Sequence, residues 1–302
     1  MYLKVYSADT SALKDPALQD RLINLLPQER REKTDSRKRA EDKAASLAAG
    51  LLLSLATERM GLPGADEYIK YNAYGKPYYD LTAYERVMHT AVRPSRVPQV
   101  YFNISHSRDR VMCAVSDAEV GCDVELIRPE VMHMAHGMLH PFESGLYEAL
   151  ADDEERQRFF FRRWAVKESY VKAAGTGYTG ILPRSLCMKE EHYEVSLHVD
   201  VGMTASTCTD GYGAGTETAE GARARIWCPG PASQDGKAAG RIGSTEVRRM
   251  LSDRESLCRF YEWDLYDGYR YACCVLAPDE ETLAQLPDEE PELIQIDLAE
   301  EF

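Results

Sequence analysis

The sequence lacks a basic excess, a long apolar run and the common nucleotide-binding loops. Its 36 Lys and Arg are outnumbered by 50 Asp and Glu, and the net charge of −14 argues against a nucleic-acid-binding protein. The longest apolar stretch covers about residues 47–56 and is interrupted by Gly50 and Ser54, so it is too short to span a bilayer. Neither the phosphate-binding pattern GxxxxGKS/T nor the dinucleotide pattern GxGxxG occurs. We therefore expect a protein that binds neither nucleic acid nor a membrane.

The sequence also lacks the features of a secreted protein. Its eight Cys form no CxxC pair, and Cys273 and Cys274 are neighbours in an apolar run, which is typical of buried thiols in a reducing cytosol. The first residues, MYLKVYSADT, do not combine a charged segment with an apolar stretch, so they predict a strand rather than a signal peptide. These observations favour a cytoplasmic location.

Apolar periodicity predicts an α/β fold. Long helices are expected over about residues 35–60 and 152–174. Alternating apolar residues predict strands over about residues 2–6, 100–104, 110–115, 120–126, 193–199, 258–264 and 270–275. A strand, a long helix and further strands follow each other loosely in both halves, which allows two related α/β lobes.

Three segments differ from this pattern. Residues 203–244 are rich in Gly, Ala, Ser and Thr, so we expect a flexible insertion between two strands, with small irregular hairpins as the alternative. From Pro278 to the end there are ten acidic residues and neither Lys nor Arg, which predicts a solvated and partly disordered acidic tail. Seven Lys and Arg crowd residues 30–43, and a basic island in an acidic protein indicates a local anionic ligand.

Residues 159–177 carry the strongest functional signal. On a helix, Trp164, Glu168 and Lys172 lie at i, i+4 and i+8, so a carboxylate and an ammonium share one face with an aromatic ring. A site that both moves a proton and holds a phosphate needs an anionic base beside a cation. The apolar bulk of Phe159–Phe161 would desolvate Glu168 and raise its basicity. The alternative is an exposed Glu–Lys pair, which stabilises a helix by only about 0.3 kcal/mol.

Asp123 and Glu125 lie two residues apart on a predicted strand, so their carboxylates project from one face. Two like charges at short distance repel, which raises a pKa or demands a cation. Carboxylate oxygens, with phosphate and water as further ligands, suit Mg²⁺ better than Zn²⁺. The alternative is a solvated strand face, and the choice between the two depends on Glu168 as a third carboxylate.

Ser105, His106 and Ser107 form a polar segment after an apolar strand, where hydroxyl and imidazole groups can hold phosphate oxygens. A Ser–His nucleophile is disfavoured, because adjacent side chains on a strand or turn point apart. A hydrogen-bonded turn histidine is the alternative. The sequence Gly75-Lys76-Pro77 is a weaker signal of the same kind, since it combines close backbone approach, a charge and a stiff loop.

His133, His136 and His140 have the spacing of a helical zinc site. Cys or acidic ligands at suitable spacing are missing nearby, and the intervening Met residues favour an ordinary amphipathic segment.

Four motifs in this order resemble the 4′-phosphopantetheinyl transferases of the surfactin-synthetase-activating type. They are GKP at 75–77, FNISHS at 102–107, GCDVE at 121–125 and WAVKESYVKAAGTG at 164–177. The resemblance covers about residues 1–278 without 203–244. It implies two similar α/β lobes, 1–118 and 119–278, related by a pseudo-two-fold axis, with coenzyme A bound between them and the acidic tail at 279–302. A monomer is expected.

The resemblance also implies the roles of the site residues. Asp123, Glu125 and Glu168 would hold Mg²⁺, or Mn²⁺, against the pyrophosphate of coenzyme A, with Glu168 and Lys172 as the catalytic residues. The expected coenzyme A contacts are Arg30, Lys33, Ser105 and His106 at the 3′-phosphate and neighbouring groups, Lys76 and Pro77 along the adenine, and Lys167 in the same pocket. The sequence departs from the family at Ala45, where Arg is common, and Lys43 stands nearby.

The implied reaction transfers 4′-phosphopantetheine from coenzyme A to a serine of an apo acyl or peptidyl carrier protein and releases adenosine 3′,5′-bisphosphate. Glu168 would take the serine proton. Two other functions use the same residues. One is a non-catalytic module that binds coenzyme A or a carrier protein, and the other is a Mg²⁺-dependent phosphohydrolase.

Overall fold

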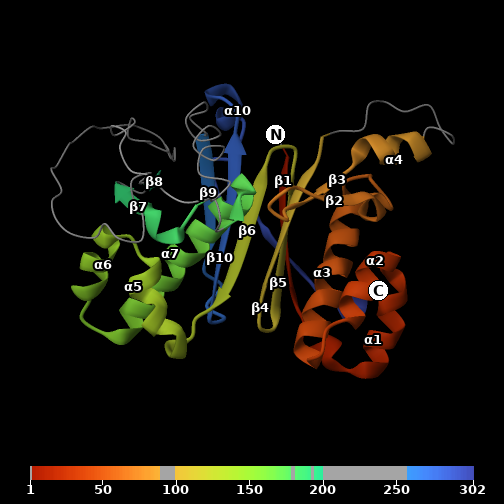
Figure 1. Cartoon of the computed structure of the whole chain (residues 1–302), viewed down its shortest axis with the longest axis horizontal. Helices are drawn as coiled ribbons and strands as arrows, with labels where there is room; N and C mark the ends of the chain where they lie inside the picture. Colours follow the sequence, from red (N-terminus) through yellow and green to blue (C-terminus); the bar gives the residue numbers. More distant parts are fainter. Residues whose placement is uncertain (1, 89–98, 178–180, 192–193, 200–256) are drawn as a thin grey trace, which may run out of the picture.

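The computed structural model describes residues 2–88, 99–177, 181–191, 194–199 and 257–302 (Figure 1). The insertion expected at 203–244 lies outside these ranges. The described strands are β1 (Leu3–Asp9), β2 (Ile69–Tyr71), β3 (Pro77–Tyr79), β4 (Tyr101–Ser107), β5 (Arg110–Ser116), β6 (Val120–Leu126), β7 (Leu186–Glu191), β8 (Glu194–Val199), β9 (Leu257–Trp263), β10 (Tyr269–Ala277) and β11 (Leu293–Ile296). The α-helices are α1 (Pro16–Leu22), α2 (Gln28–Asp35), α3 (Ala40–Arg59), α4 (Leu81–Met88), α5 (Ala135–Met138), α6 (Pro141–Glu148), α7 (Asp153–Ala174), α10 (Glu280–Ala284) and α11 (Leu298–Glu301).

Two main sheets organise these elements. The first has the strand order β11-β1-β5-β4, in which only β11 runs parallel to its neighbour, and the second is an antiparallel sheet of order β6-β10-β9. In Figure 1 the two sheets stand side by side, with α3 outside the first and α7 outside the second. The predicted mixed α/β fold is therefore confirmed. The boundaries of the two lobes and their pseudo-two-fold relation stay predictions.

Each long helix buries one face against its own sheet, and a third apolar cluster joins the sheets. Leu47 and Leu51 of α3 pack with Val111 and Val115 of β5. The sheets meet in a cluster of Val5, Met112, Val120, Val124 and Tyr271, which are almost completely buried. Burial of apolar surface is the main favourable term in folding, so this shared core holds the first and second sheets together.

The first long helix begins later than predicted. Arg39 is extended, with φ −95° and ψ 141°, and α3 begins at Ala40 rather than near residue 35. Residues 28–35 form a separate helix, α2, which carries Arg30, Arg31 and Lys33. This break separates part of the basic island from α3.

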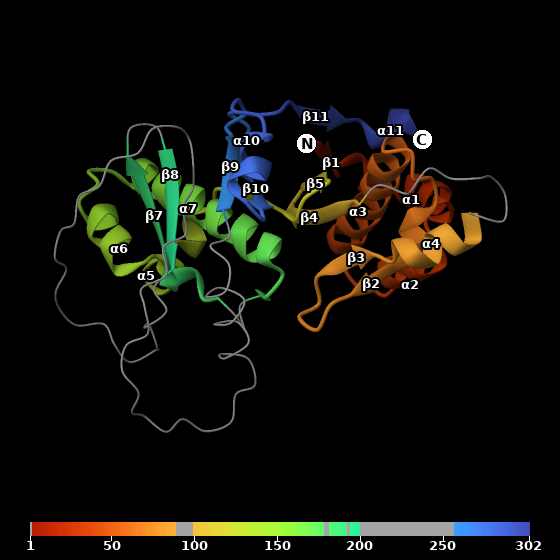
Figure 2. The ribbon, with the colours of Figure 1, turned by 90° about the horizontal axis from the view of Figure 1, so that it is seen from above.

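The acidic tail, which was expected to be partly disordered, forms regular structure. Strand β11 pairs with β1, with Leu293 opposite Val5 and Ile296 opposite Ala8. Arg259 of β9 donates to the carbonyl oxygens of Leu286 (2.6 Å) and Pro287 (2.7 Å). Figure 2 shows the tail running from α10, beside the second sheet, across to α11, beside α3. The expectation was wrong because a few apolar side chains and an open strand edge outweigh the acidic composition.

Other expectations concern the cysteines and membrane segments. The six cysteines in the described ranges are buried thiols, as predicted. Within the same part of the chain, no helix combines the length and the apolar character needed to cross a membrane.

Candidate functional site

Strands β4 and β6 bring two serines against two carboxylates. Ser105 Oγ donates to Asp123 Oδ1 at 2.8 Å, and Ser107 Oγ donates to Glu125 Oε2 at 2.9 Å. The two pairs have the same spacing of two residues on each strand, so they lie on matching faces. Asn103, earlier on β4, fixes the register because its Oδ1 accepts from the backbone N–H of Cys122 at 3.0 Å.

Helix α7 lies directly on β6 beside these pairs. Its start is capped by Asp152, which accepts from the N–H of Glu155 at 2.7 Å, and its end is marked by Gly175 in the left-handed conformation at φ +67°. Gly121 permits the close approach, since a Cβ there would lie 2.1 Å from the carbonyl oxygen of Ser169 and 2.3 Å from the nitrogen of Ala173. Any larger residue at 121 would push α7 away from the strand that carries the carboxylates.

The predicted face of α7 points at the two carboxylates of β6. Lys172 Nζ donates to Asp123 Oδ1 at 2.6 Å and to Ser105 Oγ at 2.9 Å. Trp164 Nε1 donates to Glu125 Oε1 at 3.3 Å. The Asp123 side chain is 2% exposed and that of Lys172 is 27% exposed, so the pair links the interior to the surface. The alternative of an exposed Glu–Lys pair is wrong for this helix.

Burial and charge shift the acid–base properties of this group. Burial, followed by the neighbouring Asp123, raises the pKa of Glu168 to about 7, although Lys172 acts in the opposite direction. The same two causes raise the pKa of Glu125. Burial lowers the pKa of Lys172, but Asp123 and Glu168 outweigh it, so the net shift is upward. Glu168 therefore titrates near neutrality, where a general base is most effective.

The carboxylate oxygens of this group are the type of ligand that a hard cation prefers. Asp123 Oδ2 and Glu168 Oε1 are buried and have no hydrogen-bond partner within the described part of the chain. Buried carboxylate oxygens without partners are costly, and oxygen-rich sets of this kind bind Mg²⁺. Among the described residues, however, no three His, Cys, Asp or Glu are gathered closely enough to form a metal site. Lys172 is the cation that contacts Asp123 in this structure.

The residues expected to bind coenzyme A fall into two groups. Arg30 and Lys33 on α2 line a cavity of about 700 Å³ together with Tyr71, whose ring centre lies 5.9 Å from Lys33 Nζ. Ser105 contacts Asp123 instead, whereas His106 is exposed on the opposite face of β4. Desolvation, Lys172 and Arg37 lower the pKa of His106, and Arg37 also contributes to the lowered pKa of Lys33. Arg37, to which the sequence motifs assign no role, therefore acts electrostatically on both His106 and Lys33.

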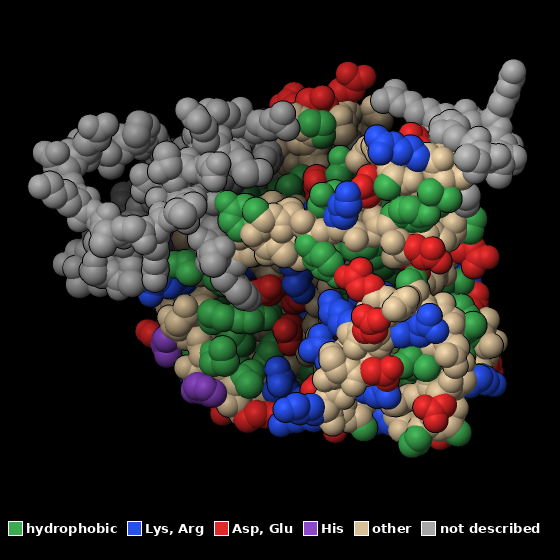
Figure 3. Space-filling model, turned by 45° about the vertical axis from the view of Figure 1, so that its right-hand side comes forward, with side chains coloured by type: hydrophobic (Ala, Val, Ile, Leu, Met, Phe, Trp, Pro, Cys, Tyr) green, Lys and Arg blue, Asp and Glu red, His purple; other side chains and the backbone are tan. Residues whose placement is uncertain are grey.

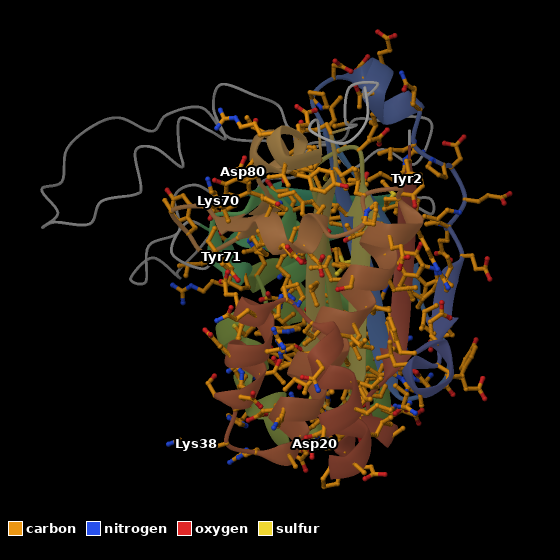
Figure 4. The ribbon with its side chains drawn as sticks, turned by 90° about the vertical axis from the view of Figure 1, so that its right-hand side faces the viewer. Tyr2, Asp20, Lys38, Lys70, Tyr71 and Asp80 are labelled. Atoms are coloured by element: carbon orange, nitrogen blue, oxygen red, sulfur yellow. The ribbon has the colours of Figure 1, made fainter. Side chains whose placement is uncertain are left out.

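Figures 3 and 4 show how charged side chains are distributed over the molecule. Figure 3 shows Lys and Arg side chains beside Asp and Glu side chains along a hollow in the molecular surface. In Figure 4, Lys38 points outward from the end of the molecule, whereas Tyr71 lies near Lys70 and Asp80, which form an ion pair at 2.5 Å. Part of the basic island therefore faces solvent.

Two predicted ligand lysines have protein partners. Lys76 Nζ donates to Glu119 Oε2 at 2.5 Å and to the carbonyl oxygen of Ala173 at 2.7 Å. Lys167, 1% exposed, forms an ion pair with the fully buried Glu143, which also accepts from the N–H of Met188 at 2.7 Å. The structure does not bring Lys167 to the carboxylates of β6, and its contact with coenzyme A stays a prediction.

The three histidines lie in and around short helices. His140 caps α6, because its Nδ1 accepts from the N–H of Phe142 at 3.2 Å. The backbone N–H of His140 in turn donates to the Glu143 carboxylate at 2.9 Å. His133 Nδ1 lies 2.9 Å from the carbonyl oxygen of Glu130. His133 and His140 therefore contact groups within residues 129–148, and these contacts explain their positions without a zinc ion.

Comparison with known proteins agrees with the resemblance that the four motifs indicate. Residues 119–218 match the family description of the 4′-phosphopantetheinyl transferase superfamily. The chain is 28% identical to a 4′-phosphopantetheinyl transferase of Bacillus subtilis over 58% of this chain and 71% of that protein. It is 31% identical to the 4′-phosphopantetheinyl transferase gsp of Aneurinibacillus migulanus, over 39% of this chain and 42% of the relative. The match therefore spans less than half the length of the second relative.

A solved structure was also found, the holo-acyl-carrier-protein synthase of Thermotoga maritima. It shares 17% identity and a TM-score of 0.32 over 54% of this chain and 64% of that one, a likeness that adds nothing to the fold argument. The family match and the curated relatives confirm the resemblance found in the four motifs. Over residues 119–218 the chain is similar to the 4′-phosphopantetheinyl transferase superfamily, and it is similar to named transferases of this type over 39 to 58% of its length.

Proposed function

We propose that this enzyme transfers 4′-phosphopantetheine from coenzyme A to a serine of an apo acyl or peptidyl carrier protein. The serine oxygen attacks the β-phosphorus of coenzyme A, the bond from that phosphorus to the bridging oxygen breaks, and adenosine 3′,5′-bisphosphate leaves. The observation that carries the proposal is the group of the buried Asp123 and Glu168 with the partly exposed Lys172, in which the ammonium bonds Asp123 while a Glu168 oxygen has no hydrogen-bond partner among the described residues.

Glu168 is the proposed base. Its pKa of about 7 leaves part of the carboxylate ionised at neutral pH and strong enough to take the serine proton, directly or through one water. Lys172 supplies a positive charge that stabilises negative charge on the phosphate oxygens. Ser105 and His106 would contribute donors at the phosphates, and Arg30 and Lys33 would hold the 3′-phosphate.

Asp123, Glu125 and Glu168 are the residues that would hold Mg²⁺ or Mn²⁺. Such an ion, when bound, supplies positive charge that neutralises the pyrophosphate.

Lys76 and Pro77 are proposed to lie along the adenine. Because the Lys76 ammonium bonds Glu119 and Ala173, this contact would use other atoms of the turn. We further propose a monomeric cytoplasmic enzyme, and the buried thiols among the described residues support the location.

The test is the mass of an apo carrier protein after incubation with the enzyme, coenzyme A and Mg²⁺. We expect a gain of one phosphopantetheine on serine that is lost in Glu168→Gln. The matched control is Glu154→Gln, which changes an exposed carboxylate on the same helix, paired with Arg158. Coenzyme A binding without any mass gain across several carrier proteins would indicate a binding module. Release of inorganic phosphate without a carrier protein would indicate a phosphohydrolase.

A further inference from the structure

The turn between β2 and β3 is rigid and is organised by one side chain. Asn72 Oδ1 accepts from the N–H groups of Tyr74 and Lys76, both at 2.9 Å, and the Asn72 N–H donates to the carbonyl oxygen of Lys76 at 2.9 Å. Such Asx-type bonds hold a turn in a single conformation. In Figures 1 and 2 this turn extends from β2 and β3 towards the C-terminal end of α7.

The turn contacts the last carbonyl groups of α7. Asn72 Nδ2 donates to the carbonyl oxygen of Gly175 at 3.0 Å, and Lys76 Nζ donates to that of Ala173 at 2.7 Å. The final carbonyls of a helix have no partner within the helix, and a cation there also opposes the negative end of the helix dipole. Both donors come from residues about a hundred positions earlier in the chain.

Other contacts make this junction close-packed. Lys76 is also bonded to Glu119, just before β6, and its side chain is only 12% exposed. A Cβ at Gly175 would lie 2.7 Å from Cδ of Lys76 and 3.2 Å from Nδ2 of Asn72. On its other side, the last turn of α7 presses on Gly121 of β6. The end of α7 is therefore held between β6 and the β2–β3 turn.

The turn of helix held in this way carries Lys172. That residue donates to Asp123 and Ser105, and Glu168 lies one turn earlier on the same helix. A displacement of the helix end would lengthen both Lys172 bonds and alter the placement of Glu168. Misplacement of reacting groups by about 1 Å can reduce rates by about 100-fold.

We propose that Asn72 and Lys76 form a clamp that positions the catalytic helix. They act through α7, by fixing Lys172 and Glu168 against Asp123, and they are positioning residues rather than catalytic ones. The role rests on the proposed function in so far as it concerns the reaction rate, whereas the clamp itself is a property of the fold. Both polar atoms of the Asn72 side chain are used within the protein, which assigns this residue to support of α7 rather than to ligand binding.

The test compares Asn72→Asp with wild-type enzyme. Aspartate keeps the oxygen that organises the turn but loses the donor to Gly175 and places a negative charge at the negative end of α7. We expect kcat to fall by about 10- to 100-fold while KM for coenzyme A stays within about two-fold. The control is Gln285→Glu, which makes the same change from amide to carboxylate at the exposed C-terminal end of another helix, α10. A higher KM with unchanged kcat would mean that Asn72 binds coenzyme A, and an unchanged kcat and KM would also overturn the proposal.

Hydrogen exchange supplies a readout that needs no activity. The Gly175 N–H donates to the Val171 carbonyl oxygen at 3.0 Å, and we expect its exchange to accelerate by about ten-fold or more in both Asn72→Asp and Lys76→Met. The first turn of α7, near Asp153, serves as the internal control. Unchanged exchange at the helix end would refute the clamp. If wild-type enzyme shows no transfer, the proposed function fails while the exchange measurement still decides whether the clamp exists.

Discussion

Replacement of Glu168 by Gln should stabilise the metal-free protein, and increasingly so as the pH rises. Burial and Asp123 raise the pKa of Glu168 from 4.5 to about 7. A carboxyl group whose pKa is higher in the folded state binds more protons there, so its contribution to stability is complete below about pH 4.5 and is lost as the pH rises through about 7. The difference of about 2.5 between the two pKa values corresponds to about 3 kcal/mol.

The assay is urea unfolding of wild type and Glu168→Gln in the presence of a chelator, from about pH 5 to pH 8. We expect the stability advantage of the variant to grow by about 2 to 3 kcal/mol across this range. Glu154→Gln, on the exposed side of α7, should differ from wild type by a constant amount. A pH-independent difference for Glu168→Gln would refute the argument that this carboxylate is desolvated, and a difference of opposite sign would mean that the charged form is stabilised.

The same unfolding experiment can be repeated with a saturating divalent ion in place of the chelator. If Asp123, Glu125 and Glu168 hold Mg²⁺, saturating ion binds the native state and should raise wild-type stability. The advantage of Glu168→Gln at about pH 8 should then disappear or reverse, because the ion compensates the buried charge. Persistence of the full advantage in Mg²⁺ would count against Glu168 as a ligand.

Three further predictions concern the fold that supports the site. Lys167→Met should lower the free energy of unfolding by about 3 kcal/mol in urea titrations, because it removes the nearest cation of the buried Glu143 and leaves only Arg163, at 3.9 Å, among the described residues; a loss below about 1 kcal/mol would contradict this. Gly121→Ala should destabilise far more than Gly145→Ala in the same titrations, since a Cβ at 145 meets nothing within 4 Å; equal effects would show that α7 can move freely. Deletion of 293–302 removes β11 and should lower the thermal midpoint, and an unchanged midpoint would mean that the β1 edge needs no cover.

Local patterns allowed the centre of the site to be predicted. The spacing of Asp123 and Glu125 follows the strand period, and Glu168 and Lys172 follow the helix period, so each pair could be assigned to a face before any partner was known. The same reasoning could have identified Ser107, because Ser105 and Ser107 repeat the spacing of the two carboxylates they contact. The resemblance of the motifs then suggested the ligand and the reaction that are proposed for this site.

Contacts between distant segments could not be predicted in this way. Lys167 stands beside Glu168 in the sequence, but adjacent helical side chains point in different directions, and its partner Glu143 lies 24 residues earlier. The contacts of Lys76 with Glu119 and Ala173, 43 and 97 residues away, are equally invisible in a three-residue motif, and its contact with coenzyme A stays a prediction. The acidic tail was misjudged for a related reason, since its charge dominates the composition while Leu293, Ile296 and Leu298 provide the burial.

The geometry also implies that the buried carboxylates of the site lower the stability of the folded protein. Asp123 bonds Lys172, but Glu168 Oε1 and Asp123 Oδ2 are buried without hydrogen-bond partners among the described residues, which raises the free energy of the folded protein. The close packing at Gly121 and the β2–β3 turn prevents α7 from relieving this by moving outward. The unfavourable arrangement is therefore maintained by contacts outside the site, and under the proposed function a cation that satisfies these oxygens would gain binding energy from it.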